Sequence, residues 1–266
     1  MAELYTVEGL TLSLADMTRK PLFGPAPQLE ILKGLDFVIH KGAVLGIVGG
    51  SGSGKSTLGR ALVRLLEPSG GVIRFGGVDI THLRDAELRP LRRRFQMIFQ
   101  DPMSSLNPRH RVGTIIAEPL RLHGFDGIAA RVARALDHVG LPGGFARRFP
   151  HELSGGQRQR VGIARAIALE PEFILADEIV SGLDVSSQAQ VLNLLEGLVR
   201  DLGLTLAFIS HDLSVVRRLC ARVMVMEGGR IVENRATADL FARPEAAYTR
   251  ELLAAIPLPD PAQVWV

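Results

Sequence analysis

Hydrophobic and polar positions along the chain follow two different periods, which divide it into three regions. Up to Gly50 the apolar residues alternate with polar ones or form short runs, as in YTVEGLTLSLA and GLDFVIHKGAVLGIVGG, a pattern typical of β-strands. From about 101 to 156 the apolar spacing is helical, in TIIAEPLRLHG and GIAARVARALDHVG, broken by Pro and Gly. From Gln157 onward, helical segments alternate with short apolar strands such as EFILAD, LTLAFIS and RVMVME. This alternation predicts βαβ units on a parallel sheet, interrupted by a helical insert.

Two further segments complete this outline. The segment KSTLGRALVRLL predicts the first strong helix, and the strand-like VIRFGG follows it. The stretch ADMTRKPLFGPAPQ is rich in Pro and Gly and predicts a surface loop between the first strands. The sequence has no internal repeat and no low-complexity segment, so we expect one large α/β unit.

The composition of the 266 residues, 47% hydrophobic and 22% charged, is ordinary for a folded globular protein. The longest apolar runs fall far short of the ~20 residues of a membrane helix. The start MAELYTVEGL carries acidic residues and lacks the apolar core of a secretory signal. Cys220, the one cysteine, excludes an internal disulfide and a Cys-clustered metal site, and its neighbours predict a buried small hydrophobe. We therefore expect a soluble, cytoplasmic protein.

The net charge of +3 raises the question of a nucleic-acid partner. The strongest basic cluster is RPLRRRF, Arg89 to Phe95, followed by Arg109 and Arg111. Aromatic residues make up only 5% of the chain and do not interleave with this cluster as a base-stacking surface requires. We predict a solvated face and no nucleic-acid partner, with anionic lipid headgroups or a protein partner as the alternative.

A phosphate-binding loop is the clearest chemical motif. The stretch GGSGSGKS follows an apolar strand, Ala43 to Val48, and opens a helix, which is the context that the G-x-x-x-x-G-K-[ST] motif needs. Backbone N–H groups of the loop would face phosphate oxygens, Lys55 would reach the β- and γ-phosphates, and Ser56 would bind Mg²⁺. The alternative is a flexible turn that matches by chance. The predicted ATP-binding residues are Gly49, Gly50, Ser51, Gly52, Ser53, Gly54, Lys55, Ser56 and Thr57.

Polar groups follow three apolar strands further along. In FILADE, Asp177 would hold Mg²⁺ through its waters, and Glu178 would orient or deprotonate an attacking water. Without the phosphate loop this pair would equally fit a helix N-cap followed by an acid of the first turn. In FISHD, His211 could bond the γ-phosphate, and in QMIFQDP, Gln100 could reach Mg²⁺ or the water. Taken singly, His211 and Gln100 are more often structural residues.

A second glycine pair opens a second helix. In LSGGQ, the residues Ser154, Gly155 and Gly156 precede a helix that we expect to begin near Gln157, and free N–H groups there make an anion site. Two such loops on one rigid chain cannot easily serve the same γ-phosphate. A two-fold dimer resolves this, because the Ser154 loop of one subunit would cover the nucleotide held by the Lys55 loop of the other.

Together these residues resemble an ABC-type ATPase. The matching motifs occur in the family's order over nearly the whole chain: the phosphate loop, FQDP at Gln100, LSGGQRQR from Leu153, ILADE to Glu178, SGLD to Asp184 and SHD at His211. The stretches QMIFQDPMSSLNPR, DVSSQAQVLNLL, FISHDLSVVRRL and YTRELLAAIPLPDP are similar to the ATP-binding subunits of oligopeptide, dipeptide and nickel importers.

This resemblance implies a fold and a set of roles. The fold would be a P-loop NTPase core with a mostly parallel sheet, an N-terminal antiparallel β subdomain and an inserted α-helical subdomain. The chain would be one ATP-binding domain, 1–266, with its core at 1–100 and 157–235, its helical subdomain at about 101–156 and a C-terminal helical tail at 236–266. Glu178, His211 and Gln100 would be catalytic. Ser56, Gln100 and Asp177 would bind Mg²⁺, and ATP would be completed in trans by Ser154, Gly155, Gly156, Gln157 and Asp184.

The resemblance also implies partners and a location. The subunit would hydrolyse ATP at the cytoplasmic face of the inner membrane, docked beneath two transmembrane permease subunits. Gln100 would link the state of the nucleotide to the permease contact. The second ATPase subunit would be identical or homologous, and an extracytoplasmic solute-binding protein would deliver the cargo.

The sequence departs from the family at three positions. The aromatic residue that stacks on adenine is replaced by Leu14, and Phe23 or Tyr5 could substitute for it. Ile179 stands where proline usually follows the glutamate, and Gly182 replaces an alanine that is common in SGLD. None of these changes removes a catalytic group.

Several functions fit these observations. The first is a peptide importer subunit, because the AIPLPDP tail looks peptide-type, while LCARVMVMEGGRIVE looks somewhat like a nickel importer. A non-transport ATPase acting on DNA or the ribosome usually carries long coiled-coil insertions or two cassettes, and this chain has one cassette and no heptad run. A module in which ATP only clamps the dimer would not need Glu178 and His211, so their presence argues against it.

Overall fold

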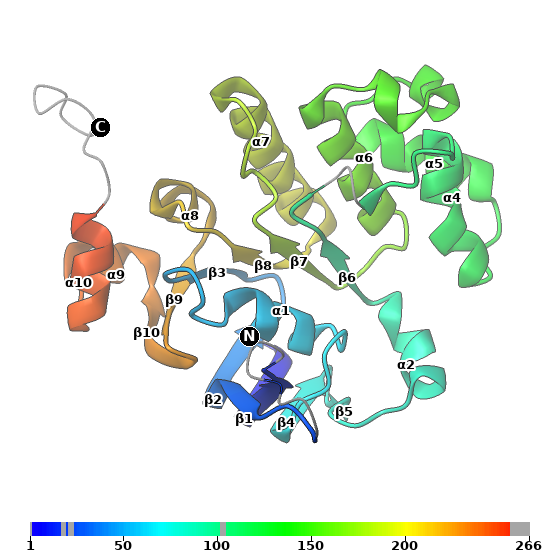
Figure 1. The fold of residues 1–266 in the computed structure, drawn as a ribbon. Coiled ribbons are helices and arrows are strands. Elements are labelled where there is room, and N and C mark those ends of the chain that lie inside the picture. Colours follow the sequence, from blue (N-terminus) through cyan, green and yellow to red (C-terminus); the bar gives the residue numbers. More distant parts are fainter. Residues whose placement is uncertain (1, 17–19, 21–23, 102–104, 256–266) are drawn as a thin grey trace, which may run out of the picture.

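The computed structural model describes residues 2–16, 20, 24–101 and 105–255, which contain two β-sheets (Figure 1). The first sheet is antiparallel, has four strands and follows the order β2-β1-β4-β5. Its strands are β1 (Glu3–Ala15), β2 (Gln28–His40), β4 (Gly70–Phe75) and β5 (Val78–Asp79). This sheet is the N-terminal antiparallel part that the resemblance implied.

The second, central sheet has six strands in the order β10-β9-β3-β8-β7-β6. All of its neighbouring strands run parallel except β9 and β10, which pair antiparallel. The prediction of a mostly parallel sheet is therefore confirmed. Its strands are β3 (Val44–Val48), β6 (Phe95–Ile98), β7 (Phe173–Asp177), β8 (Thr205–Ile209), β9 (Arg222–Glu227) and β10 (Arg230–Ala236).

The strand β10 did not emerge from the hydrophobic pattern. Its sequence, RIVENRA, mixes polar and apolar residues and lies at the edge of the sheet, where a strand needs only one bonded neighbour. Gly228 and Gly229 join it to β9, and both have positive φ angles, 52° and 83°. A two-residue hairpin loop with positive φ at both positions matches the right-handed twist of the strands, which explains the glycine pair.

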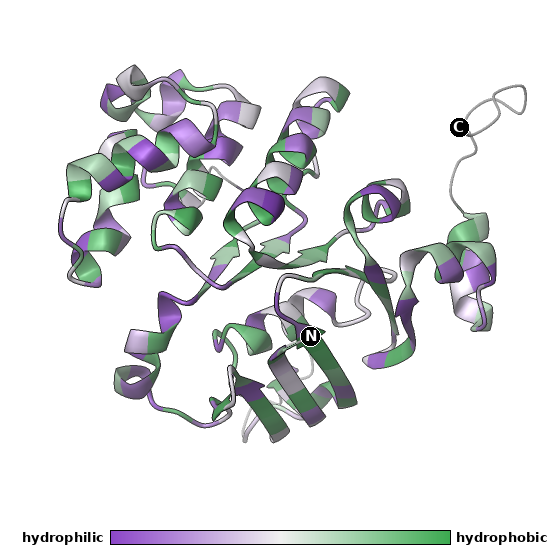
Figure 2. Cartoon of the chain, turned by 180° about the vertical axis from the view of Figure 1, so that it is seen from behind, coloured by the Kyte–Doolittle hydropathy of each residue, from purple (hydrophilic) through white to green (hydrophobic). Residues whose placement is uncertain are grey.

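The central strands are buried on both faces, as expected for a parallel sheet covered on two sides. Along β3, Val44 and Val48 join one hydrophobic core, whereas Leu45 and Ile47 join another. The strands β7 and β8 divide their residues between the same two cores. Figure 2 shows the resulting concentration of hydrophobic residues along these strands. Their carboxyl ends consequently meet at one edge of a rigid platform.

The helices cover this platform on both faces. Helix α1 (Lys55–Leu62) lies between the two sheets, where Leu58 and Leu62 are fully buried (Figure 1). Helices α6 (Gly155–Ile167), α7 (Val185–Leu202) and α8 (Leu213–Leu219) contribute to the core on the other face. The short helix α2 (Asp85–Arg92) precedes β6, and α9 (Thr237–Ala242) and α10 (Ala247–Ala254) follow β10.

The segment between β6 and α6 is helical in its described part. It contains α4 (Val112–Leu122), α5 (Ile128–His138), η2 (Gly143–Arg147) and η3 (Pro150–Glu152), and α4 and α5 pack against α6. The described residues from 101 to 156 form no β-strand. No helix in the described ranges is long and apolar enough to cross a membrane.

Two local expectations can be compared directly with the structure. Helix α6 begins at Gly155, two residues before Gln157, because Ser154 is its N-cap: the Ser154 Oγ accepts a bond from the Gln157 backbone N–H. Cys220 is buried as predicted, and its Sγ lies 3.1 Å from where a Cβ on Gly46 would be. Burial raises the pKa of the Cys220 thiol far above its ordinary value, as expected for an inert thiol.

Candidate active site

The phosphate loop connects the end of β3 to the start of α1 and lines a cavity of about 610 Å³. Gly49 has φ 150°, and a Cβ there would lie 2.1 Å from the carbonyl oxygen of Met226, so only glycine fits. Glu178 and His211 line the same cavity, together with Ile31 and Leu252. The loop from Gly49 to Thr57 therefore opens onto a cavity that also holds ionisable side chains.

Lys55 is held against its own loop. Lys55 is only 7% exposed, and its Nζ donates hydrogen bonds to the carbonyl oxygens of Gly49 and Gly50, at 2.8 Å each. Burial lowers the pKa of Lys55, and the nearby carboxylates of Glu178 and Asp177 oppose that shift. The loop thus presents a partly desolvated ammonium beside its backbone N–H groups, which suits the binding of phosphate oxygens.

Ser56 and Asp177 are in direct contact. The Ser56 Oγ donates a hydrogen bond to Asp177 Oδ1 at 3.0 Å. Asp177 ends β7 and is 4% exposed; burial raises its carboxyl pKa, and the bond from Ser56 opposes that change. A hydroxyl and a carboxylate at the edge of a phosphate cavity are the oxygen donors that Mg²⁺ prefers, so this pair fits that ion.

Glu178 has an unusual backbone conformation. Its φ of 49° is in the left-handed region, which a residue with a side chain adopts only where its surroundings hold it there. The Glu178 N–H donates to the carbonyl oxygen of Ile209 on β8, at 3.0 Å. This turn directs the residue after β7 toward the neighbouring strand end.

The Glu178 carboxylate meets polar side chains from both neighbouring strands. The Gln100 Nε2 donates to Glu178 Oε2 at 3.0 Å, and the His211 Nδ1 lies 3.7 Å from Glu178 Oε1. Gln100 follows β6 and His211 follows β8, on either side of β7 in the sheet. The structure thus brings together all three side chains that the sequence analysis proposed as catalytic, although each had a structural alternative.

The second glycine pair occupies a different place. Ser154 is exposed and forms a capping box with Gln157, whose Oε1 accepts the Ser154 N–H at 3.0 Å. Asp184 caps α7, accepting the Ser187 N–H at 2.9 Å, and hydrogen bonds from Ser187 lower the pKa of its carboxyl. A Cβ on Gly156 would lie 3.2 Å from Ser187 Oγ, so the two caps are neighbours. Neither cap lines the cavity of the phosphate loop.

The residues considered as adenine contacts lie in different surroundings. Leu14 is 39% exposed and pairs with Leu29 across β1 and β2, so it forms an apolar surface without an aromatic ring. The suggestion that Tyr5 replaces the aromatic residue is wrong. Tyr5 is fully buried beside the rings of Phe75 and Phe173, and its hydroxyl donates to a backbone carbonyl. Phe23 lies outside the described residues.

The other two departures from the family have local explanations. Ile179 is 1% exposed and packs in the core, so its side chain adds buried apolar surface, whereas a proline would restrict the backbone. Gly182 has φ 75°, a conformation that favours glycine over alanine. Neither position touches the cavity.

Sequence reasoning missed two cavity residues, Ile31 and Leu252. Ile31 lies in a strand whose apolar pattern could not say which end faced the phosphate loop. Leu252 lies almost 200 residues from the loop, in the YTRELL stretch that the sequence analysis used only for the family resemblance, so the sequence carried no signal that it reaches the cavity. Both are apolar, whereas the other residues that line the cavity are glycines or carry polar side chains.

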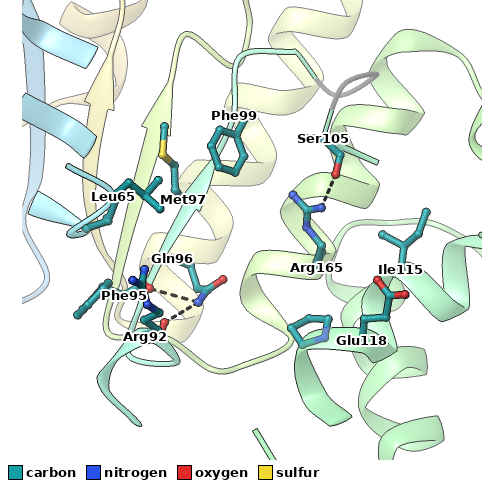
Figure 3. Close-up of a pocket in the computed structure, with 12 residues that line it drawn as sticks. Leu65, Arg92, Phe95, Gln96, Met97, Phe99, Ser105, Ile115, Glu118 and Arg165 are labelled. Carbon is teal, nitrogen blue, oxygen red and sulfur yellow. Dashed lines mark hydrogen bonds between the residues drawn. The ribbon is translucent and has the colours of Figure 1, made fainter. Parts of the chain in front are cut away.

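A second cavity, of about 580 Å³, lies between β6 and the helical region (Figure 3). Phe99, the residue after β6, is 39% exposed, and Leu65 is 48% exposed. Glu118 of α4 and Arg165 of α6 lie on the opposite side, with Arg165 Nη1 donating to the Ser105 carbonyl oxygen. This cleft therefore combines exposed apolar side chains with charged ones, and Phe99 is adjacent to Gln100.

Comparisons with known proteins agree with this geometry. Residues 32–181 match the family model described as ABC transporter. Putative peptide import ATP-binding proteins of Brucella ovis and Brucella abortus are 55% identical to the chain over 236 residues, which is 88% of this chain and 74% of theirs. The glutathione import ATP-binding protein GsiA of Salmonella typhi is 51% identical over 239 residues, 89% of this chain and 38% of that protein.

Solved structures show the same fold. A dimeric ATP-binding cassette in a post-hydrolysis state, bound to ADP and Pi, is 28% identical with a TM-score of 0.77, covering 88% of this chain and 99% of that one. The cbiO1 protein of Clostridium perfringens, part of the transporter complex cbiONQ, is 29% identical with a TM-score of 0.79 and 97% coverage of both chains. The chain therefore belongs to the ABC transporter family and is one of its ATPases.

Proposed function

We propose that this chain is the ATP-hydrolysing subunit of an ABC importer whose cargo is a peptide. The observation that carries the enzymatic part is the meeting of Gln100, Glu178 and His211 beside the Lys55 loop. The 55% identity to proteins named for peptide import, and the 51% identity to one named for import of the tripeptide glutathione, support the cargo class. None of the relatives named above is a nickel importer.

In this proposal the residues of the site bind the phosphates, activate a water molecule and hold Mg²⁺. Backbone N–H groups of the loop and the ammonium of Lys55 bind the phosphates of ATP. Glu178, oriented by Gln100 and close to His211, positions the attacking water or takes its proton. Ser56 and Asp177, with Gln100, would hold Mg²⁺, which when bound neutralises charge on the phosphate oxygens. The left-handed turn at Glu178 keeps its carboxylate at the cavity edge.

The nucleotide is shared between two subunits. Ser154, Gly155, Gly156, Gln157 and Asp184 of one subunit would face the phosphate loop of the other. Ser154 and Asp184 are exposed, and none of the five residues lines the cavity of its own chain, which supports this arrangement. The dimeric state of the related ATP-binding cassette supports it as well. The second subunit is either an identical chain or a homologous one.

The remaining parts of the proposal concern the whole transporter. Two permease subunits would bind the cleft beside Phe99, and the adjacent Gln100 would carry the state of the site to that contact. The ATPase would sit at the cytoplasmic face of the inner membrane, with a solute-binding protein on the far side. Residues 1–266 would act as one domain, divided into a core (1–100 and 157–235), a helical subdomain (about 101–156) and a tail (236–266).

A reconstituted transporter tests both parts. The ATPase subunit, the permeases and the solute-binding protein encoded beside it would be placed in liposomes, and phosphate release measured with short peptides or with Ni²⁺. We expect peptides to stimulate hydrolysis. Stimulation by Ni²⁺ alone would overturn the peptide assignment, and an absence of hydrolysis in the assembled complex would overturn the enzymatic one.

A further inference from the structure

The C-terminal helix α10 contacts the phosphate loop through a tyrosine, Tyr248. The hydroxyl oxygen of Tyr248 accepts a hydrogen bond from the Gly50 backbone N–H at 2.7 Å. The two residues are 198 positions apart in the sequence. Leu252, one helical turn after Tyr248, lines the cavity of the loop. This side of α10 is therefore directed at the nucleotide-binding part of the protein.

The residue at position 50 is matched to this contact. A Cβ on Gly50 would lie 2.9 Å from the Tyr248 hydroxyl oxygen, closer than real Cβ contacts come. Gly50 is not among the residues with positive φ, so its backbone would accept any side chain. A side chain at position 50 would therefore have to displace the Tyr248 hydroxyl, although it would meet no positive φ angle.

The bond acts on a peptide unit that also contacts Lys55. In the unit joining Gly49 to Gly50, the carbonyl oxygen accepts from Lys55 Nζ at 2.8 Å, and the N–H donates to Tyr248. Both polar ends of the unit are thus bonded, which fixes its plane. Losing either bond would let the unit rotate, which would change the direction of the Gly49 carbonyl oxygen that Lys55 binds.

The helix that carries Tyr248 is itself anchored to the sheet. Glu233 on β10 is only 7% exposed, and its carboxylate oxygens accept the backbone N–H groups of Glu245 and Ala246, at 3.1 Å each, at the start of α10. Arg235 of the same strand pairs with Glu245 at 2.6 Å. The edge strand therefore places α10, and α10 places the tyrosine.

We propose that Tyr248 is a positioning residue for ATP binding: it holds the first peptide unit of the phosphate loop through Gly50, and thereby the ammonium of Lys55. This inference rests on the proposed role of the Lys55 loop as the ATP site. Tyr248 touches no reacting atom, so its effect falls on the affinity for ATP and not on the chemical step.

The test compares Tyr248→Phe, Gly50→Ala and the double variant. Binding of a non-hydrolysable ATP analogue with Mg²⁺ is measured by calorimetry on the full chain, and KM and kcat on the assembled transporter. Tyr248→Phe removes one hydrogen bond, so we expect about a two- to tenfold weaker affinity and higher KM, with kcat within about twofold. Gly50→Ala should weaken binding further, because its methyl group also displaces the hydroxyl.

The double variant distinguishes positioning from simple loss of packing. Without the hydroxyl, the methyl group introduced at position 50 has room, so Gly50→Ala should cost nothing more when it is combined with Tyr248→Phe. The proposal would be overturned if the two substitutions weakened ATP binding by independent factors that multiply in the double variant. An unchanged KM for Tyr248→Phe would overturn it too. A fall in kcat at constant KM would overturn it as well.

Two controls accompany the series. Tyr5→Phe removes the hydroxyl of the other of the chain's two tyrosines, which donates to the Leu62 carbonyl oxygen in the core. It should lower the melting temperature and leave ATP affinity unchanged. Lys55→Ala should abolish tight ATP binding. If Lys55→Ala binds normally, the ATP-site assignment itself is wrong; if only Tyr248→Phe binds normally, the site stands and the positioning role falls.

Discussion

Two glycine-containing loops open helices in this molecule, and their surroundings differ. The loop before α1 is enclosed: Lys55 and Asp177 are 7% and 4% exposed, and Glu178 and His211 line the same cavity. The loop before α6 begins at the exposed Ser154, whose side chain bonds to the N–H of Gln157 in its own helix. One loop is surrounded by the groups that ATP chemistry needs, and the other is not.

The ionisable side chains of the candidate site gather around the first loop and not around the second. The groups around the first loop come from the carboxyl ends of β3, β6, β7 and β8, which the parallel sheet brings to one edge. The second loop offers helix N–H groups but no carboxylate or ammonium partner from the cavity. In our proposal, one chain contributes a chemical half-site around the Lys55 loop and a separate covering half-site around Ser154, which two-fold symmetry would join.

The largest effect should come from the chemical half-site. Replacing Glu178 with Gln keeps the shape and the contact with Gln100 but removes the base, so phosphate release should fall about 100-fold or more. ATP binding should persist, and a closed dimer should accumulate in size-exclusion chromatography. Near-normal phosphate release by this variant in the assembled transporter would show that another group activates the water.

A smaller effect is expected at the predicted adenine contact. Leu14 gives apolar contact without a flat ring, and stacking an aromatic ring on a base contributes ~1–3 kcal/mol in nucleic-acid contacts. Leu14→Tyr should therefore tighten ATP binding by at least about fivefold, as measured by fluorescent-nucleotide titration. If Phe23 fills the gap instead, Leu14→Tyr changes little and Phe23→Ala weakens binding. If neither substitution changes the affinity for ATP, neither residue contacts the base.

The smallest effect distinguishes the cap at Ser154 from its role in the dimer. Ser154→Ala removes the acceptor for the Gln157 N–H and should lower the free energy of unfolding by about 1 kcal/mol, measured by urea denaturation. ATP binding to the separate chain should not change, because Ser154 lies outside its cavity. If the separate chain lost affinity for ATP, Ser154 would act in the site of its own chain and not in the site of the partner.

Local motifs explain how much of this site could be predicted from the sequence. The strand, loop and helix around Lys55 are contiguous, and so are β7 and Glu178, so their geometry follows from a short stretch of chain. Gln100 and His211 could be placed because each is the second residue after an apolar strand. In a parallel sheet the ends of such strands lie together whatever the order of the strands.

The parts that could not be predicted depend on contacts between distant segments. The burial of Tyr5 depends on which face of β1 meets α1, and alternation alone leaves that choice open. The edge strand β10 carries polar residues that its single neighbour tolerates, so its pattern is weak. The contact of Tyr248 with Gly50 spans 198 positions and involves a residue type that no phosphate-loop motif specifies.

The most direct test of the shared site mixes two defective subunits. Lys55→Ala removes the chemical half-site and Ser154→Arg blocks the covering half-site, so each variant alone has two broken sites per dimer. A mixed dimer would have one site with both defects and one intact site. We predict that each variant is inactive alone and that an equal mixture regains phosphate release, up to about one quarter of the wild-type rate if the subunits pair at random. Two inactive variants that stay inactive after mixing, or a Ser154→Arg variant that is fully active alone, would contradict the shared site.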